Sequence, residues 1–301
     1  MKIIKYFFSI IIASFIFSSC ESIVDVALPS YKLQLVVNST FGNNDIPRVE
    51  VSHSLSSLDN ANFESISNAT VKLFENGNYI ATLIYDPTNF DYFYSGSSFQ
   101  TQTGKTYEIR VSASPYDSVS STTTIPDSVN MTGFNFKDSA YVDQNGQPVG
   151  TLDVSINDKK DIANYYEFML FEADSVFDIN QGGWVFNAYP VYLTSTDASV
   201  DQNNQSGESI SFDDAYFDGK NYTTHFTFNK SYSQWGSPVI KHFYLQVRSL
   251  SKEYFLYNKS LNAQFNSQGN PFAEPAPVYN NIQNGLGIWG SFNDQPIRQL
   301  K

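Results

Sequence analysis

The chain has 301 residues, and its 30 acidic against 18 basic side chains give a formal net charge of −12. A surface this acidic repels phosphate backbones, which disfavours nucleic-acid binding. A single cysteine excludes an internal disulfide and a cysteine-based zinc cluster, so the fold must depend on its hydrophobic core. The 25 Phe and 20 Tyr, with only 16% charged residues, favour strands over helices.

Residues 1–19 have the pattern of a secretory signal peptide. Lys2 and Lys5 precede an apolar stretch over residues 6–17 that is shorter than the roughly 20 residues a transmembrane helix needs. The small residues that follow end at Cys20, which resembles the lipobox of bacterial lipoproteins. In a lipobox the cysteine is acylated and becomes the first residue of the mature chain.

The segment Phe17-Ser18-Ser19-Cys20 departs from the strict lipobox, which has Leu first and Gly or Ala before the cysteine. The alternative is an ordinary cleaved signal peptide with a chance cysteine, but the arrangement favours lipid anchoring. Cleavage removes two lysines and leaves 16 basic against 30 acidic side chains, a charge of −14. We expect residues 20–31 to form a lipidated tether.

Residues 32–126 predict an N-terminal immunoglobulin-like sandwich. Leu33, Leu35 and Val37 alternate with polar or outward positions, as in a half-buried strand. Asn76-Gly77 lies between two apolar runs and predicts a hairpin, because both residues tolerate positive φ. Several further short strands separated by turn residues complete the pattern of a sandwich.

Residues 127–301 predict a second, fibronectin type III-like sandwich, with the boundary near Pro126. Within it, residues 195–221 are a polar, acidic insertion with little periodicity. A helix is expected at about 251–265, capped by Ser251 and with an apolar stripe over Tyr254, Tyr257, Leu261 and Phe265. Three prolines then predict an extended C-terminal segment. The predicted fold class is all-β, with two tandem sandwiches and one short helix.

Gly285, Gly287 and Gly290 satisfy G-x-G-x-x-G, but no helix can follow them and the dinucleotide-binding interpretation fails. We expect these glycines to let Trp289 pack closely at a sheet edge. The acidic insertion raises calcium as a hypothesis, because carboxylate oxygens gather around a turn there. Its residues are Asp213, Asp214 and Asp218 with Gly219 and Asn221. The spacing does not fit an EF-hand, and we expect a solvated loop and no metal or cofactor.

The histidines are not clustered, which indicates exposed strand positions rather than a metal site; they are His53, His225 and His242. No G-x-S-x-G elbow is present, and no carboxylate pair stands out among the acidic residues. The protein is therefore expected not to be an enzyme. Trp184 and Trp235 lie beside glycines and are candidate ligand-contact aromatics, with core packing as the alternative.

Asp-Ser followed by a small aliphatic residue occurs four times, which resembles an O-glycosylation signal of exported bacterial proteins. The acceptors would be Ser118, Ser128, Ser139 and Ser175. The alternative interpretation is that Asp-Ser pairs form turns at strand ends.

The segment from Asn270 to Ile282, followed by Asn284-Gly285-Leu286-Gly287-Ile288-Trp289-Gly290, is similar to lipoproteins grouped as domain of unknown function 4249. Cys20-Glu21, Val36-Val37 and the helix start at Ser251 also fit this family. The resemblance implies a lipoprotein of the outer membrane, often encoded beside a TonB-dependent receptor, with no established enzymatic activity. Glu21 and Asp25 resemble the acidic signal that directs such proteins to the cell surface.

The expected function is that of a surface lipoprotein that acts as an accessory or ligand-capture partner of a TonB-dependent transporter. Its contact with the outer membrane is the N-terminal lipid. A cell-surface adhesin or glycan-binding module is the alternative, because tandem sandwiches suit it equally and fold alone cannot decide.

Overall fold

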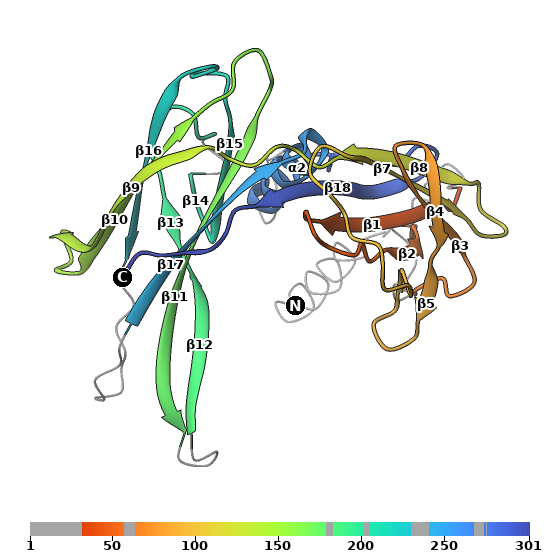
Figure 1. Cartoon of the computed structure of the whole chain (residues 1–301), viewed down its shortest axis with the longest axis horizontal. Helices are drawn as coiled ribbons and strands as arrows, with labels where there is room; N and C mark the ends of the chain where they lie inside the picture. Colours follow the sequence, from red (N-terminus) through yellow and green to blue (C-terminus); the bar gives the residue numbers. More distant parts are fainter. Residues whose placement is uncertain are drawn as a thin grey trace, which may run out of the picture. The chain divides into compact units, whose positions relative to one another are not determined.

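The computed structural model describes residues 32–56, 64–178, 183–201, 205–229, 241–267, 274 and 276–301. All elements below belong to one compact unit, Leu33–Lys301. Strands in several sheets dominate, and α2 is the one helix of the described residues (Figure 1). A mostly β protein with one helix near the C-terminus is thus confirmed. Within these ranges no helix has the length and apolar character to cross a membrane.

The strands before residue 126 surround one group of buried side chains, which we call the first core. They are β1 (Leu35–Phe41), β2 (Glu50–His53), β3 (Thr70–Glu75), β4 (Asn78–Thr82), β5 (Ile84–Asp86), β6 (Asp91–Phe93), β7 (Thr106–Ser112) and β8 (Val119–Thr124). Four of them form a sheet in the order β4-β3-β7-β8, and β5 pairs with β6. Asn76 and Gly77, with φ of 48° and 79°, form the turn between β3 and β4, which confirms the predicted hairpin.

A second core lies between two sheets built by later strands. These strands are β9 (Met131–Val142), β10 (Pro148–Asn157), β11 (Tyr165–Asp178), β12 (Gly183–Val191), β13 (Leu193–Thr194), β14 (Ser206–Gly207), β15 (Ser209–Asp213), β16 (Asn221–Asn229) and β17 (Lys241–Leu250). One sheet has the order β14-β13-β16-β10-β9, and the other contains β12-β11-β17. The rings of Phe168 on β11 and Phe226 on β16 pack against each other across the core, with their centroids 5.3 Å apart.

The expectation that residues 195–221 form an insertion with little periodicity was wrong, because β14, β15 and the start of β16 lie in this range. Strand β15 pairs with β11 from Tyr165↔Asp213 to Met169↔Ser209. Only two apolar side chains of β15, Ile210 and Phe212, are buried. Two apolar residues within a polar run are too few to produce a periodic signal, so the strand depends on its tertiary neighbours.

Strand β18 (Leu286–Asp294) runs from one core to the other. It pairs in parallel with β1 from Val36↔Leu286 to Phe41↔Ser291, and in antiparallel with β17 through Leu250↔Phe292. The resulting sheet order β12-β11-β17-β18-β1-β2 is continuous across both cores. The C-terminal segment, which the sequence assigned to the second sandwich, therefore contributes to the first core as well. Strand β19 (Arg298–Gln299) then pairs with β17.

The glycines of β18 allow close backbone packing against β1, which pairs with residues 286–291. Gly287 has φ of 116°, and a Cβ there would lie 2.1 Å from the carbonyl oxygen of Val37 on β1. Any side chain would push the two strands apart, so only glycine fits. Two residues later, the fully buried Trp289 enters the first core.

Helix α2 (Lys252–Ser267) agrees with the predicted helix at about 251–265. Ser251 caps it: its hydroxyl accepts a bond from the Tyr254 amide at 3.3 Å. The predicted apolar stripe is wrong in detail, because Phe255 is the buried residue of the helix and Phe265 is 57% exposed. Phe255 stacks on Tyr165 of β11 at 4.7 Å. In the extended segment expected next, residues 268–273 and 275 lie outside the described residues.

Trp289→Ala should destabilise the chain by about 3–5 kcal/mol, because it leaves a large cavity in the first core. Chemical denaturation measures this loss. Hydrogen exchange should rise most in β1 and β7, because Phe41 of β1 contacts the indole ring and the Tyr107 carbonyl of β7 accepts its N–H. Ile297→Ala, at a side chain that is 60% exposed, is the control and should unfold like the wild type. Equal destabilisation by both variants would contradict the assignment of Trp289 to the core.

Candidate functional site

Several sequence-predicted positions cannot be placed in a site. The signal peptide, the tether, Cys20 and Trp235 lie outside the described residues. Trp184 lies on β12 and pairs with Phe177, and Ser175 lies on β11, but their side chains are outside the described part. Of the predicted O-glycosylation acceptors, Ser118, Ser128 and Ser139 are exposed. They belong to different segments, beside β8, between the two cores and on β9, and so do not form one site.

A cavity of about 490 Å³ lies between residues 196–201, strand β15 and helix α2, and we call it the α2 pocket. Its floor is apolar: Phe212 of β15 is 1% exposed and Phe255 of α2 is 4% exposed. Because Phe255 also stacks on Tyr165 of β11, this floor is held by strands β11 and β15 as well as by helix α2.

The loop that forms one side of the α2 pocket is held by Asp197. One oxygen of its carboxylate accepts bonds from the Ser199 amide at 3.1 Å and the Ser199 hydroxyl at 3.0 Å, and also from the Tyr222 hydroxyl. Such bonds from a carboxylate to the chain two residues ahead stabilise a turn. Burial, followed by the bond to Asp197, raises the pKa of the Tyr222 hydroxyl, which keeps this donor protonated. The bonds to Asp197 therefore hold the turn at residues 197–199 within the chain itself.

The opposite side of the α2 pocket carries an exposed aromatic side chain and charged groups. Tyr216 is 68% exposed, and its turn is stabilised by a bond from the Ala215 amide to Asp213 at 3.2 Å. Lys259 of α2 forms an ion pair with Asp201 at 3.1 Å. The pocket thus combines an apolar floor, an open aromatic ring, a hydrogen-bond donor and several acceptors.

The turn that follows β15 also contributes to an acidic cluster next to the pocket. Carboxylate oxygens of Asp158, Asp214 and Asp218 lie within 4.8 Å of one another, and the first two residues are buried. The set differs from the calcium hypothesis, because Asp213 faces the α2 pocket and Asp158 takes its place. Among the residues that the structure describes, these three form the group that could hold a divalent cation.

Protein donors already bind each carboxylate of the acidic cluster. Asp158 accepts from the Gly219 amide at 2.8 Å, Asp214 from the Asn164 amide at 2.8 Å, and Asp218 from the Asp161 amide at 2.9 Å. Burial raises the pKa of Asp214, the Asn164 bonds oppose it, and the nearby charge of Asp158 adds to the rise. Hydrogen bonds to these carboxylates therefore join the loops that meet here, while the carboxylates repel one another.

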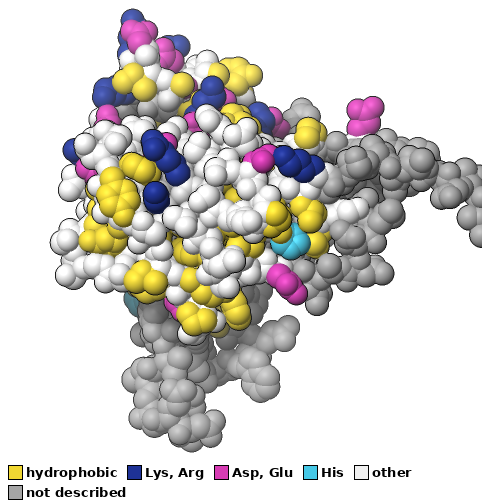
Figure 2. Space-filling view, turned by 90° about the vertical axis from the view of Figure 1, so that its right-hand side faces the viewer, with side chains coloured by type: hydrophobic (Ala, Val, Ile, Leu, Met, Phe, Trp, Pro, Cys, Tyr) yellow, Lys and Arg dark blue, Asp and Glu magenta, His cyan; other side chains and the backbone are white. Residues whose placement is uncertain are grey.

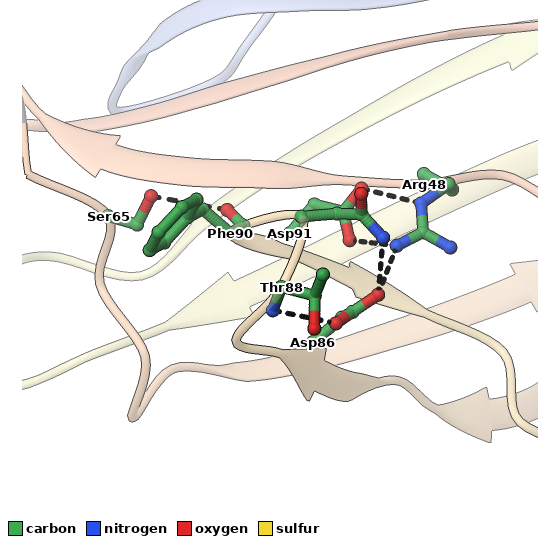
Figure 3. Close-up of polar contacts among 7 residues, drawn as sticks. Arg48, Ser65, Asp86, Thr88, Phe90 and Asp91 are labelled. Atoms are coloured by element: carbon green, nitrogen blue, oxygen red, sulfur yellow. Dashed lines mark hydrogen bonds and ion pairs between the residues drawn. The ribbon is translucent and has the colours of Figure 1, made fainter.

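A second polar network lies at the hairpin of β5 and β6 (Figure 3). Arg48 binds Asp91 through Nε at 2.6 Å and Asp86 through Nη2 at 2.8 Å. The side chain of Asn89, then the Thr88 amide and Arg48, lower the pKa of Asp86. The network fixes the turn that holds Phe90 at φ of 59°, with 61% of its side chain exposed. Its groups bond one another, which indicates a structural role.

Exposed apolar side chains occur on the strands around both the first and the second core. Figure 2 shows the side that carries β3, β4 and β5 in Figure 1, where hydrophobic side chains form small groups among polar ones and both charge signs intermingle. Elsewhere, a shallow and mostly apolar groove of about 420 Å³ lies on the β11-β12-β17 part of the large sheet. It is lined by Phe171, Ala188, Tyr244, Gln246 and Ile297.

Sequence reasoning missed Asp158, Tyr216 and Lys259. Asp158 follows the end of β10 and Tyr216 lies in the turn after β15, so they meet the other site residues only through long-range pairing. Lys259 is one of many polar residues on α2, and nothing in the local pattern distinguishes it. The available signal was the run Asp213-Asp214-Ala215-Tyr216, which places an aromatic residue inside an acidic turn.

These features define an all-β protein with two hydrophobic cores, a shared strand and a ligand-sized pocket. The model of the family described as domain of unknown function (DUF4249) matches residues 21–298. The chain therefore belongs to this family, which confirms the resemblance of its C-terminal segment. A search of curated proteins found no match.

Asp214→Asn should stabilise the protein at neutral pH when a chelator is present. The folded-state pKa of Asp214 is raised, so its contribution to stability is greatest at low pH and is lost as the pH rises through that value. Asparagine keeps the acceptor for Asn164 but carries no charge. Thermal unfolding measured from acid to neutral pH should show a smaller loss of stability with rising pH for Asp214→Asn than for the wild type. Glu208→Gln, at an exposed residue, is the matched control; identical profiles for all three proteins would contradict the repulsion.

Proposed function

We propose that this protein is a lipid-anchored, non-enzymatic protein of the outer membrane that faces the cell exterior. The observation that carries the proposal is the position of Cys20. It ends a signal-like segment, and the family match begins at the next residue, Glu21. Glu21 is the second residue of the mature chain if Cys20 becomes its acylated first residue. More than one acyl chain would be needed for stable anchoring, since a single chain binds only marginally.

The anchored domain acts as an accessory or ligand-capture partner of a TonB-dependent transporter. Two features support this role: the family resemblance, and the α2 pocket, whose volume of about 490 Å³ suits a small molecule. In this proposal the two cores correspond to an immunoglobulin-like sandwich followed by a fibronectin type III-like one. The exposed Ser118, Ser128 and Ser139, together with Ser175, are its proposed O-glycosylation acceptors.

A cell-surface adhesin or glycan-binding module is the second candidate. The observation in its favour is the exposed ring of Tyr216 at the α2 pocket. An adhesin would bind its target without a transporter, so the two candidates differ in what purifies with the protein.

Cys20→Ser should release the protein from membranes, because serine removes the thiol that carries the lipid. Fractionation of cells and immunoblotting measure the distribution between membrane and soluble fractions. Ser19→Ala, which brings the segment closer to the strict lipobox, should remain in the membrane fraction. A Cys20→Ser protein that also stays there would contradict anchoring through this residue.

Purification of the wild-type protein from native outer membranes in mild detergent should yield a stoichiometric β-barrel transporter. Mass spectrometry of the eluted complex identifies the partner. An unrelated lipoprotein with the same tag is the control for nonspecific capture. Reproducible elution of the protein alone, after solubilisation that keeps other outer-membrane complexes intact, would exclude the transporter role and favour the adhesin.

A further inference from the structure

We propose that the α2 pocket binds a saccharide, with Tyr216 as its stacking surface and Asp213 and Lys259 as hydrogen-bonding groups. The inference rests on the ligand-capture role proposed above and names the class of ligand. It is carried by three properties of the pocket: its apolar faces, its mixture of donors and acceptors, and the internal bonds that hold its polar groups.

The apolar faces suit the carbon skeleton of a sugar. Tyr216 exposes 68% of its side chain at the wall of a cavity, whereas the pocket's other aromatic residues, Phe212 and Phe255, are buried beneath it. An exposed tyrosine ring offers a flat apolar surface and a polar hydroxyl on one side chain. A sugar ring has the complementary form, with C–H groups on its faces and hydroxyls around its edge.

The polar groups of the wall favour a neutral, polyhydroxylated ligand. Lys259 can only donate hydrogen bonds, Asp213 can only accept them, and the amide of Gln205 does both. A hydroxyl group also does both, so a saccharide can satisfy each of these groups. An anion would be repelled by Asp213 and the neighbouring Asp201, and a small cation would leave the donors of Lys259 and Gln205 without an acceptor from the ligand.

Bonds within the chain hold the polar groups of the pocket in place. Asp201 binds Lys259 at 3.1 Å, and the Ala215 amide binds one oxygen of Asp213 at 3.2 Å. Asp197 orders the loop opposite through its bonds to Ser199. Preorganised walls reduce the entropy lost on binding, which matters for flexible oligosaccharides that make few apolar contacts.

The test uses the full mature protein in a non-glycosidic detergent, since glycoside detergents would compete for the pocket. The probes are a printed oligosaccharide array and then calorimetric titration of the saccharide that binds most strongly. Spermidine and inorganic phosphate are titrated as cationic and anionic probes. The variants are Tyr216→Ala and Asp213→Asn, of which the second keeps the size of the side chain. Tyr141→Ala, at a tyrosine of β9 that is 52% exposed, is the matched control.

We expect a saccharide to bind, with the dissociation constant raised about tenfold or more by Tyr216→Ala and by Asp213→Asn, which corresponds to about 1.4 kcal/mol each. Tyr141→Ala should bind like the wild type. The inference is overturned if no saccharide binds, if binding survives both pocket variants, or if spermidine or phosphate binds in the pocket instead. None of these results removes the transporter from the purified complex, so failure here is distinct from failure of the proposed function.

Discussion

Trp289 and strand β18 hold together parts of the chain that are distant in the sequence. The indole Nε1 donates to the carbonyl of Tyr107 at 3.0 Å, and its ring contacts Phe41 at 4.6 Å. The backbone is bound on both sides: β1 pairs along one side, and the side chain of Asn281 takes the Trp289 amide and carbonyl at 2.9 and 2.8 Å. The first core therefore cannot be complete until the end of the chain has been added to it.

The junction where β18 leaves the first core and joins β17 depends on Arg248. Its Nε binds Asp294 of β18 at 2.5 Å, its Nη1 lies 3.4 Å from Glu167 of β11, and its guanidinium covers the ring of Phe292 at 4.3 Å. Glu167 is only 4% exposed, so loss of the arginine would leave a buried carboxylate without its counter-charge. Breaking such a pair costs about 3–5 kcal/mol, whereas its net contribution against apolar replacements is small. The network therefore specifies how β11, β17 and β18 align more than it strengthens them.

Local signals were sufficient where their cause is local. Asn76-Gly77 and Ser251 predicted a turn and a helix start because positive φ and amide capping involve only neighbouring residues. The position of β18 was not predictable in this way, because Trp289 meets a carbonyl 182 positions earlier. The candidate site has the same limitation: Asp158 meets Gly219 across 61 positions, and the acidic turn alone gave no indication of it. Long-range pairing, not composition, decides which acidic residues face each other.

The α2 pocket depends on the same connection. Helix α2 lies in the chain between β17 and β18. Its capping residue, Ser251, binds both the first turn of the helix and strand β18. Ser251 caps the helix, its amide donates to Ser291 of β18 at 2.8 Å, and its hydroxyl accepts from the Ser291 amide at 3.2 Å. Phe255 and Lys259 follow on the same helix and form one wall of the pocket. The strand that completes the first core thus also fixes the wall of a pocket on the second.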